Sequence, residues 1–255
     1  MADVADERAA GDMNGLRAWS AERVQEDTMA SVARHVPSGA AVLELGAGTG
    51  RLSRMLRDAG YRVVAGDWRD EAFVPRDIEC RKVDCDDAGE VGRIFGGERY
   101  AAVVCGDLIE HLKNPFAFIQ SVAGLLAENG HVFVTTPNIL SPTSRVNILV
   151  NGNANSFGPM GLEIGHINPL FPSVLNAAFR CAGLEPLECR GAGRVRRVEV
   201  HSFRGWSQWL LSVLLRFLMR KVVDAPVLLC VGRAAQTGGG FSGGPVGTGT
   251  GGCYR

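Results

Sequence analysis

Short apolar segments of strand length alternate with helical patterns from Ala41 to Thr135. Regular alternation of this kind indicates a parallel sheet covered by helices on both faces. We therefore predict an α/β fold with a doubly wound, mostly parallel sheet. The strands are predicted at 41–45, 62–65, 78–83, 100–105 and 131–135, and the helices at 51–59, 87–95 and 115–126.

The flanking segments complete a single predicted domain at residues 16–233. It begins with an amphipathic helix at 16–35, preceded by an acidic stretch, 1–15, that we expect to be disordered. The glycine-rich tail, 234–255, has little apolar material to bury and is also expected to be disordered. Near the end of the domain we predict one further helix and three further strands, at 172–182, 184–190, 194–200 and 226–233.

A glycine-rich stretch, ELGAGTG, joins the first predicted strand to the first predicted helix. A P-loop would require a lysine after the last glycine, and a dinucleotide fingerprint would require glycine at position 51, where arginine stands. What remains is an acid, Glu44, followed by glycines at 46, 48 and 50. A turn that only packs against its neighbours is the alternative to a ligand-binding turn.

Acidic residues follow the next strands as well. Asp67 ends the second predicted strand, Asp84 ends the third, and the segment CGDLIEHLKNP follows the fourth. Ligands of open α/β sheets bind beyond the carboxyl ends of the strands, where these segments converge. Asp67 is placed to accept hydrogen bonds from both hydroxyl groups of a ribose, and Asp84 to contact an adenine amino group.

This order of motifs resembles the class I S-adenosylmethionine-dependent methyltransferases, in particular a small bacterial group with TPN after the fifth strand and a GHINPLF-like segment before the next helix. The resemblance covers about residues 19–232. It implies a seven-stranded sheet with an antiparallel last strand and S-adenosyl-L-methionine as the cofactor. The cofactor-binding residues that it implies are Glu44, Gly46, Ala47, Gly48, Gly50, Asp67, Trp68, Asp84, Cys85 and Asp107.

Two histidines are the candidates for catalysis. His166 lies in a polar, glycine-flanked loop where a substrate would enter, and histidine is suited to proton transfer near neutral pH. His111 lies in the motif after the fourth strand, where a structural role in ordering the loop is equally plausible. Glu163 and Asp107 are weaker candidates. No metal site is expected.

Two segments are expected to shape the site of the methyl acceptor. Residues 138–170 are rich in Asn, Gly, Ser and Pro, and we expect a long irregular excursion over the site. The second segment is 203–222, whose apolar residues at 206–221 leave only a narrow polar stripe on a helix. We weigh two hypotheses for this helix: packing on the sheet or a second subunit, and peripheral contact with a membrane.

The function predicted from these features is O-methylation of a sugar, glycan or other small-molecule hydroxyl, an activity of enzyme class EC 2.1.1. The alternative acceptor is a quinone or prenylated phenol, and the rival from another class is an inactive methyltransferase-fold binding module. The 27 basic and 27 acidic residues balance, which argues against a general nucleic-acid partner. The seven cysteines form no C-x-x-C pair, so we expect reduced thiols and a cytoplasmic protein. Under the membrane hypothesis, the protein would lie at the inner face of the membrane.

Overall fold

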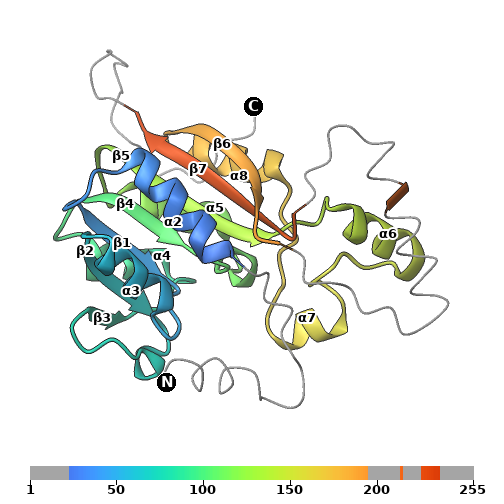
Figure 1. Cartoon of the computed structure of the whole chain (residues 1–255), viewed down its shortest axis with the longest axis horizontal. Coiled ribbons are helices and arrows are strands. Elements are labelled where there is room, and N and C mark those ends of the chain that lie inside the picture. The colour runs from blue at the N-terminus through green and yellow to red at the C-terminus, as the bar shows by residue number, and fades with distance from the viewer. Residues whose placement is uncertain (1–22, 195–212, 215–224, 236–255) are drawn as a thin grey trace.

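The computed structural model describes residues 23–194, 213–214 and 225–235, and these residues form a mixed sheet with helices on both faces (Figure 1). The sheet has seven strands in the order β3-β2-β1-β4-β5-β7-β6. Strands β1 to β5 are parallel, and β7 is antiparallel to both β5 and β6, so the predicted sheet with an antiparallel last strand is confirmed. The strand bounds are Ala41–Leu45, Arg62–Asp67, Glu79–Lys82, Tyr100–Cys105, Leu126–Pro137, Leu184–Ala192 and Val227–Ala234 for β1 to β7.

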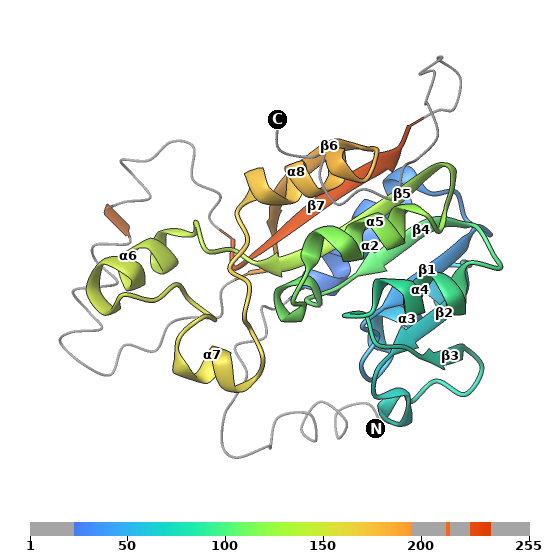
Figure 2. The same cartoon turned by 180° about the vertical axis from the view of Figure 1, so that it is seen from behind.

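The helices divide between the two faces of the sheet, as the two opposite views show (Figures 1 and 2). Helices α2 and α3 cover one face, and α4, α5 and α8 cover the other. The short helices α6 and α7 lie beyond the carboxyl end of β5, away from both faces. The helix bounds are Val24–His35, Arg51–Asp58, Ala88–Phe95, Pro115–Ala123, Pro142–Asn151, Pro159–Glu163 and Pro172–Cys181 for α2 to α8.

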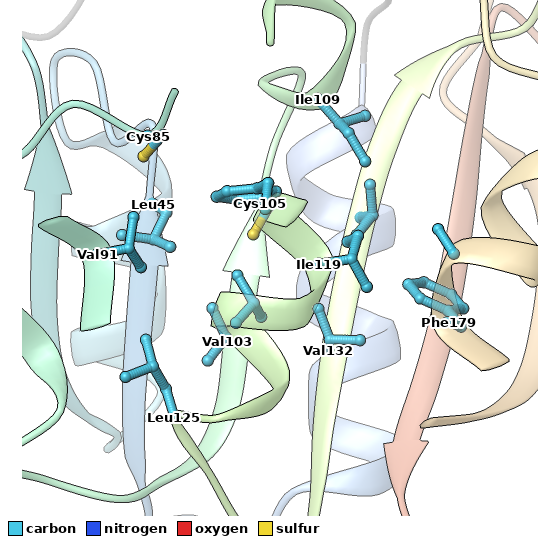
Figure 3. Close-up of a cluster of buried hydrophobic side chains, with 14 of the residues drawn as sticks. Leu45, Cys85, Val91, Val103, Cys105, Ile109, Ile119, Leu125, Val132 and Phe179 are labelled. Carbon is cyan, nitrogen blue, oxygen red and sulfur yellow. The ribbon is translucent and has the colours of Figure 1, made fainter. Parts of the chain in front are cut away.

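The main hydrophobic core lies between the sheet and helices α4, α5 and α8 (Figure 3). Leu45, Val103 and Val132 project from three neighbouring strands into this core, where Ile119 of α5 and Phe179 of α8 pack against them. A second cluster packs α2 and α3 on the opposite face. With both faces covered, the strands are buried on both sides, which explains their continuous apolar sequence.

The helix predicted at 115–126 is shorter in the structure. The side chain of Asn114 caps its start by accepting a hydrogen bond from the amide of Ala117, and the helix ends at Ala123, before Gly124. Strand β5 then begins at Leu126 and continues to Pro137, so it extends well beyond the predicted 131–135. The other predicted strands and helices agree to within a few residues where the structure describes them; residues 16–22 and 195–200 lie outside the described part.

Residues 138–170 were predicted to be irregular, but they contain two helices. Proline occupies the first turn of both α6 and α7, where its missing N–H group costs no hydrogen bond. Ser141 caps α6 by accepting a hydrogen bond from the amide of Ser144. The short polar residues that made this segment resemble a loop therefore serve as helix caps and connections.

The expectation of reduced cysteines is wrong for Cys189 and Cys230. Cys189 of β6 and Cys230 of β7 occupy paired positions of the antiparallel ladder and are joined by a disulfide bond. This pairing depends on strand register, which cysteine spacing in the sequence does not reveal. Cys80, Cys85 and Cys105 are free thiols.

Within the described residues, no helix has the length and apolar character needed to cross a membrane. The helix predicted at 206–221 lies outside the described part except for Val213 and Leu214. The predicted disordered segment at 1–15 also lies outside it, as does the predicted tail at 234–255 except for Ala234, which ends β7, and Ala235.

Candidate functional site

The glycine turn begins directly after β1, at the carboxyl end of the sheet. Its first amide, that of Gly46, donates a hydrogen bond of 2.8 Å to the carbonyl oxygen of Gly66 on β2. Gly46, Gly48 and Gly50 have φ angles of +74°, +53° and +82°. Side chains rarely adopt these left-handed conformations, so the backbone path of the turn requires glycine at all three positions.

The three glycines differ in what lies beside them. A Cβ at Gly50 would come within 2.5 Å of Phe73 and 2.6 Å of Pro75, so this glycine is needed for packing. A Cβ at Gly46 would meet Leu108 at 3.2 Å. A Cβ at Gly48 would meet no atom of the described residues within 4 Å, so among the three glycines Gly48 is the one whose free face is open to a ligand.

Asp67, at the end of β2, fixes this turn. One carboxylate oxygen accepts a hydrogen bond of 2.8 Å from the amide of Gly48, and the other accepts one of 2.8 Å from the amide of Arg69. Asp67 is only 6% exposed. Each carboxylate oxygen can accept a further hydrogen bond, so the residue can still receive hydroxyl groups of a ligand.

Trp68 follows Asp67 and is 68% exposed, with the guanidinium of Arg69 lying 5.7 Å from its ring centroid. Its large apolar ring is therefore available beside the turn. Asp84 and Cys85 follow β3: Asp84 is exposed, and Cys85 is buried. Burial raises the pKa of the Cys85 thiol to about 12, so it remains protonated at neutral pH.

Glu44 does not point its carboxylate at open space. It is 4% exposed and accepts a short hydrogen bond from the hydroxyl of Ser53 in α3. Burial raises its pKa to about 7, with the charge of Asp67 acting in the same direction and the bond from Ser53 opposing. The observed contact ties the first turn of α3 to β1, whereas the predicted contact with the cofactor ammonium group is not tested.

A second group of polar residues follows β4 in the 3₁₀ turn η2, which spans Ile109–His111. Just before it, Asp107 donates its amide to the hydroxyl of Thr135 and accepts a hydrogen bond of 2.8 Å from that hydroxyl. Asp107 keeps part of its surface open to solvent. Desolvation of its carboxylate by the surrounding protein raises its pKa, whereas the hydrogen bond from Thr135 lowers it.

The two candidate catalytic histidines are in contact. The rings of His111 and His166 have centroids 4.7 Å apart and planes inclined at 80°. A Cβ at Gly165 would come within 3.2 Å of Nδ1 of His111, so glycine allows this approach. Burial lowers the pKa of His111, and His166 acts in the same direction, while hydrogen bonds to the backbone of Gly165 and Ile164 oppose.

Glu110 lies beside these histidines and is fully buried. Within the described residues, neither of its carboxylate oxygens makes a well-formed hydrogen bond. Burial raises its pKa to about 8, with the charge of Asp107 acting in the same direction and the hydroxyl of Thr136 opposing. Its carbonyl oxygen accepts hydrogen bonds of 3.0 Å from the amides of Ile167 and Asn168, which hold the loop after α7 against η2.

The structure brings Asp67 to Gly48 and His111 to His166, and it adds three residues to these two groups. Glu110, Thr135 and Ser53 were not predicted to take part. The sequence signal for Glu110 was its place directly before His111. The ligand-binding atoms of Glu110, His111 and His166 lie within 4.8 Å of one another, although no metal site was expected.

The residues around the turn fit a nucleoside-type cofactor. Gly48 offers an open backbone face, and Asp67 retains acceptor capacity next to it. Helix α3 begins at Arg51 and directs its free N–H groups toward the same edge of the sheet. These features are independent of the family resemblance and are consistent with it.

Comparison with known protein families gives one match, to a methyltransferase domain, over residues 19–188. The match covers the glycine turn, the acidic residues that follow the strands, and the histidine cluster. It extends from the region before α2 into β6.

Among curated proteins, the chain is similar to ubiquinone biosynthesis O-methyltransferases. It is 26% identical over 159 residues to that of Ralstonia nicotianae, covering 60% of this chain and 66% of the relative. It is 32% identical over 117 residues to that of Xanthomonas axonopodis pv. citri, covering 42% and 46%. The relative from Bordetella avium is 28% identical over 177 residues, covering 66% and 71%, so the chain spans between 46% and 71% of these relatives.

Solved structures support the fold. An S-adenosylmethionine-dependent methyltransferase from Archaeoglobus fulgidus has a TM-score of 0.54 at 14% identity, covering 82% of this chain and 94% of that one. The Burkholderia thailandensis 1,6-didemethyltoxoflavin-N1-methyltransferase has a TM-score of 0.54 at 15% identity, covering 91% and 88%. At these identities the likeness concerns the fold alone.

Proposed function

This chain belongs to the class I S-adenosylmethionine-dependent methyltransferases, and we propose that it methylates a hydroxyl oxygen of a phenolic small molecule, such as a quinol or a prenylated phenol. The observation that carries the proposal is the position of two groups at one edge of the sheet. The open turn at Gly48 lies at the carboxyl end of β1, and the cluster of His111 and His166 lies after the neighbouring strand β4.

S-adenosylmethionine supplies a methyl group activated by bonding to a positively charged sulfur. The turn at 46–50 would hold its amino-acid end, because the open face of Gly48 permits close backbone approach. Asp67 would accept hydrogen bonds from the ribose, and Asp84 with Cys85 would contact the adenine. Trp68 provides an exposed ring beside the same site.

The cluster of His111 and His166 would receive the acceptor hydroxyl. The hydroxyl oxygen must lose its proton as it forms a bond to the methyl carbon; the bond between that carbon and sulfur breaks, and its electron pair stays on sulfur. A positioned base accelerates such a step by about 10²- to 10⁴-fold. Because burial lowers the pKa of His111, this ring is neutral and able to accept a proton at pH 7.

Two observations favour a phenolic acceptor over the sugar or glycan that the sequence placed first. The curated relatives carry names that refer to ubiquinone biosynthesis. In addition, Ile164 and Ile167, on either side of His166, are 56% and 45% exposed. Leu162 adds to this apolar surface at 58% exposure. Apolar side chains at the acceptor position suit a prenylated ring better than a sugar.

The experiment that tests the proposal is a transfer assay with labelled S-adenosylmethionine. The full chain is incubated with a catechol carrying a short prenyl chain, with the same catechol lacking that chain, and with a reducing sugar, and products are identified by mass spectrometry. We expect a methyl ether of the prenylated catechol and much less product from the other two. Methylation of the sugar alone would contradict the proposal.

Two rival functions predict different results. An inactive binding module would be stabilised thermally by S-adenosylhomocysteine but would transfer no methyl group to any acceptor. A nicotinamide oxidoreductase would be stabilised by NADH in preference. For a ligand at a hundredfold excess over its dissociation constant, stabilisation is about 2.7 kcal/mol, which a thermal scan detects readily.

A further inference from the structure

Three potential metal ligands meet where η2 contacts the loop after α7. Glu110 and His111 come from η2, and His166 comes from the loop. One ligand atom from each residue lies within 4.8 Å of the other two. This is a mixed set of one carboxylate and two imidazoles, brought together from segments that are distant in the sequence.

The carboxylate of Glu110 makes no well-formed hydrogen bond within the described residues, although the hydroxyl of Thr136 is near enough to lower its pKa. The residue is fully buried, and both carboxylate oxygens lack a hydrogen bond. A buried, unpaired carboxylate is strongly unfavourable unless it is neutralised or coordinates a cation. A metal ion at this position would satisfy it directly.

The ring of His166 is oriented as a metal ligand requires. Its Nδ1 lies 2.9 Å from the carbonyl oxygen of Ser156. A carbonyl oxygen can only accept, so Nδ1 carries the proton and Nε2 keeps its lone pair. Metal-binding histidines almost always donate their second ring nitrogen to a carbonyl or carboxylate in this way.

The loop that carries His166 is held partly by backbone hydrogen bonds. The amides of Ile167 and Asn168 donate to the carbonyl oxygen of Glu110, and the amide of His166 donates to the carbonyl oxygen of Gly161 at 2.9 Å. A cation bound by the three side chains would leave these backbone bonds intact, and the ring of His111 also hydrogen-bonds the backbone of Gly165 and Ile164. Asp107 is not part of the set, because its carboxylate is bonded to Thr135.

We propose that Glu110, His111 and His166 bind a divalent transition-metal ion of the zinc type, with positions left open for the acceptor oxygen. Two imidazoles with one carboxylate favour such an ion over Mg²⁺, which prefers oxygen ligands. With metal–ligand distances of about 2.1 Å, tetrahedral ligand atoms lie about 3.4 Å apart. Because the ligand atoms of the three side chains all lie within 4.8 Å of one another, only small side-chain movements are needed to bind one ion.

The proposal that this site binds a metal does not depend on the proposed function. The catalytic role that we give to the metal does rest on that function. A hydroxyl oxygen coordinated to the metal loses its proton to solvent more readily, since a bound cation lowers the pKa of its oxygen ligands. The deprotonated oxygen would form the bond to the methyl carbon as the carbon–sulfur bond breaks. With a metal bound, solvent would take the proton in place of His111, and the two histidines would act as metal ligands.

Zinc binding to the full chain tests the site. Protein treated with a chelator and dialysed is titrated with Zn²⁺ by calorimetry, and Co²⁺ is added separately to read coordination from its visible absorption. We expect one Zn²⁺ per chain, with Glu110→Gln and His166→Ala each weakening binding by about tenfold or more. His131→Ala is the matched control: His131 pairs with His35 at a ring distance of 5.2 Å on another part of the sheet.

The outcomes separate the site from the function. If the wild type binds no Zn²⁺, or if both site variants bind it as tightly as His131→Ala, the metal site is wrong. S-adenosylhomocysteine binding is measured on each variant as a check of folding; a variant that fails this check is replaced by His111→Gln. Methyl transfer that persists at full rate in metal-free protein would overturn the catalytic role of the metal. Zinc binding without methyl transfer to any phenol would overturn the proposed function but leave the metal site intact.

Discussion

Gly48→Ala and Gly39→Ala form a matched pair that isolates ligand contact from backbone strain. Gly39 lies in the turn before β1 with a φ angle of +83°, and Gly48 lies in the turn after β1 with a φ angle of +53°. Both are exposed, and a Cβ at either position would meet nothing within 4 Å in the part of the chain that the structure describes. The two substitutions therefore impose a similar conformational cost on the folded protein.

That cost can be worked out from the backbone alone. A side chain in the left-handed region costs about 1–2 kcal/mol, and replacing glycine lowers the entropy of the unfolded chain by about 0.4–1 kcal/mol. The net loss is about 1 kcal/mol, or about 2–4 °C in Tm for a chain of this size. Only Gly48→Ala adds a methyl group where the cofactor is proposed to lie. Overpacking there costs about 1–3 kcal/mol, which corresponds to about 5- to 150-fold in Kd.

The assay is calorimetric titration of each variant with S-adenosylhomocysteine, together with a thermal scan without ligand. We expect similar small decreases in Tm for both variants and a weaker Kd for Gly48→Ala alone. Equal Kd values for the two variants would refute the reasoning, because the open face of Gly48 would then not contact the cofactor. A much larger loss of Tm for Gly48→Ala would show that the turn itself had changed.

Three further predictions concern the same edge of the sheet. Gly50→Ala should reduce the yield of folded protein or lower Tm far more than Gly48→Ala, because its Cβ would collide with Phe73; a thermal scan measures this. Asp67→Ala should weaken S-adenosylhomocysteine binding by about 10- to 100-fold, since hydrogen bonds to a charged group contribute about 1.5–3 kcal/mol, and unchanged calorimetric affinity would rule out the ribose role. Glu44→Gln should change how stability depends on pH. The folded-state pKa of Glu44 is raised to about 7 from an ordinary value of 4.5, so the free energy of unfolding of the wild type falls as pH rises from about 4.5 to 7, by up to about 3 kcal/mol. Urea unfolding at several pH values should show a weaker dependence of this free energy on pH for Glu44→Gln.

The parallel half of the sheet could be predicted closely because its signals are local. Strand β4 spans Tyr100–Cys105 as predicted, since Arg99 and Gly106 bound a continuous apolar run. The start of β5 was missed because Leu126 belongs equally well to an amphipathic helix pattern. Pairing with Tyr100 of β4 assigns it to the sheet, and pairing between distant segments leaves no local trace.

The acceptor side of the site was predicted less completely for the same reason. His111 and His166 were each chosen from their surroundings, but their contact depends on the loop after α7 docking on η2. That docking is made by backbone hydrogen bonds to the carbonyl oxygen of Glu110, which no side-chain pattern encodes. The importance of Glu110 appears only once its burial and its unpaired oxygens are known.

The two halves of the site are held by different kinds of structure, and this difference has a functional consequence. The proposed cofactor half is fixed by β1 and β2, whose register pairs Leu45 with Gly66 and so brings the amide of Gly46 to the carbonyl oxygen of Gly66 and the amide of Gly48 to Asp67. The proposed acceptor half includes helices α6 and α7 and the loop that follows, which project beyond the sheet (Figure 2). Because no strand of the parallel core passes through 138–170, substitutions there can change the acceptor without disturbing the register that holds the cofactor. If residues 138–170 bind the acceptor as proposed, one fold can methylate chemically different acceptors beside an unchanged cofactor site, and substitutions in 138–170 should change the acceptor while substitutions in the glycine turn change cofactor binding.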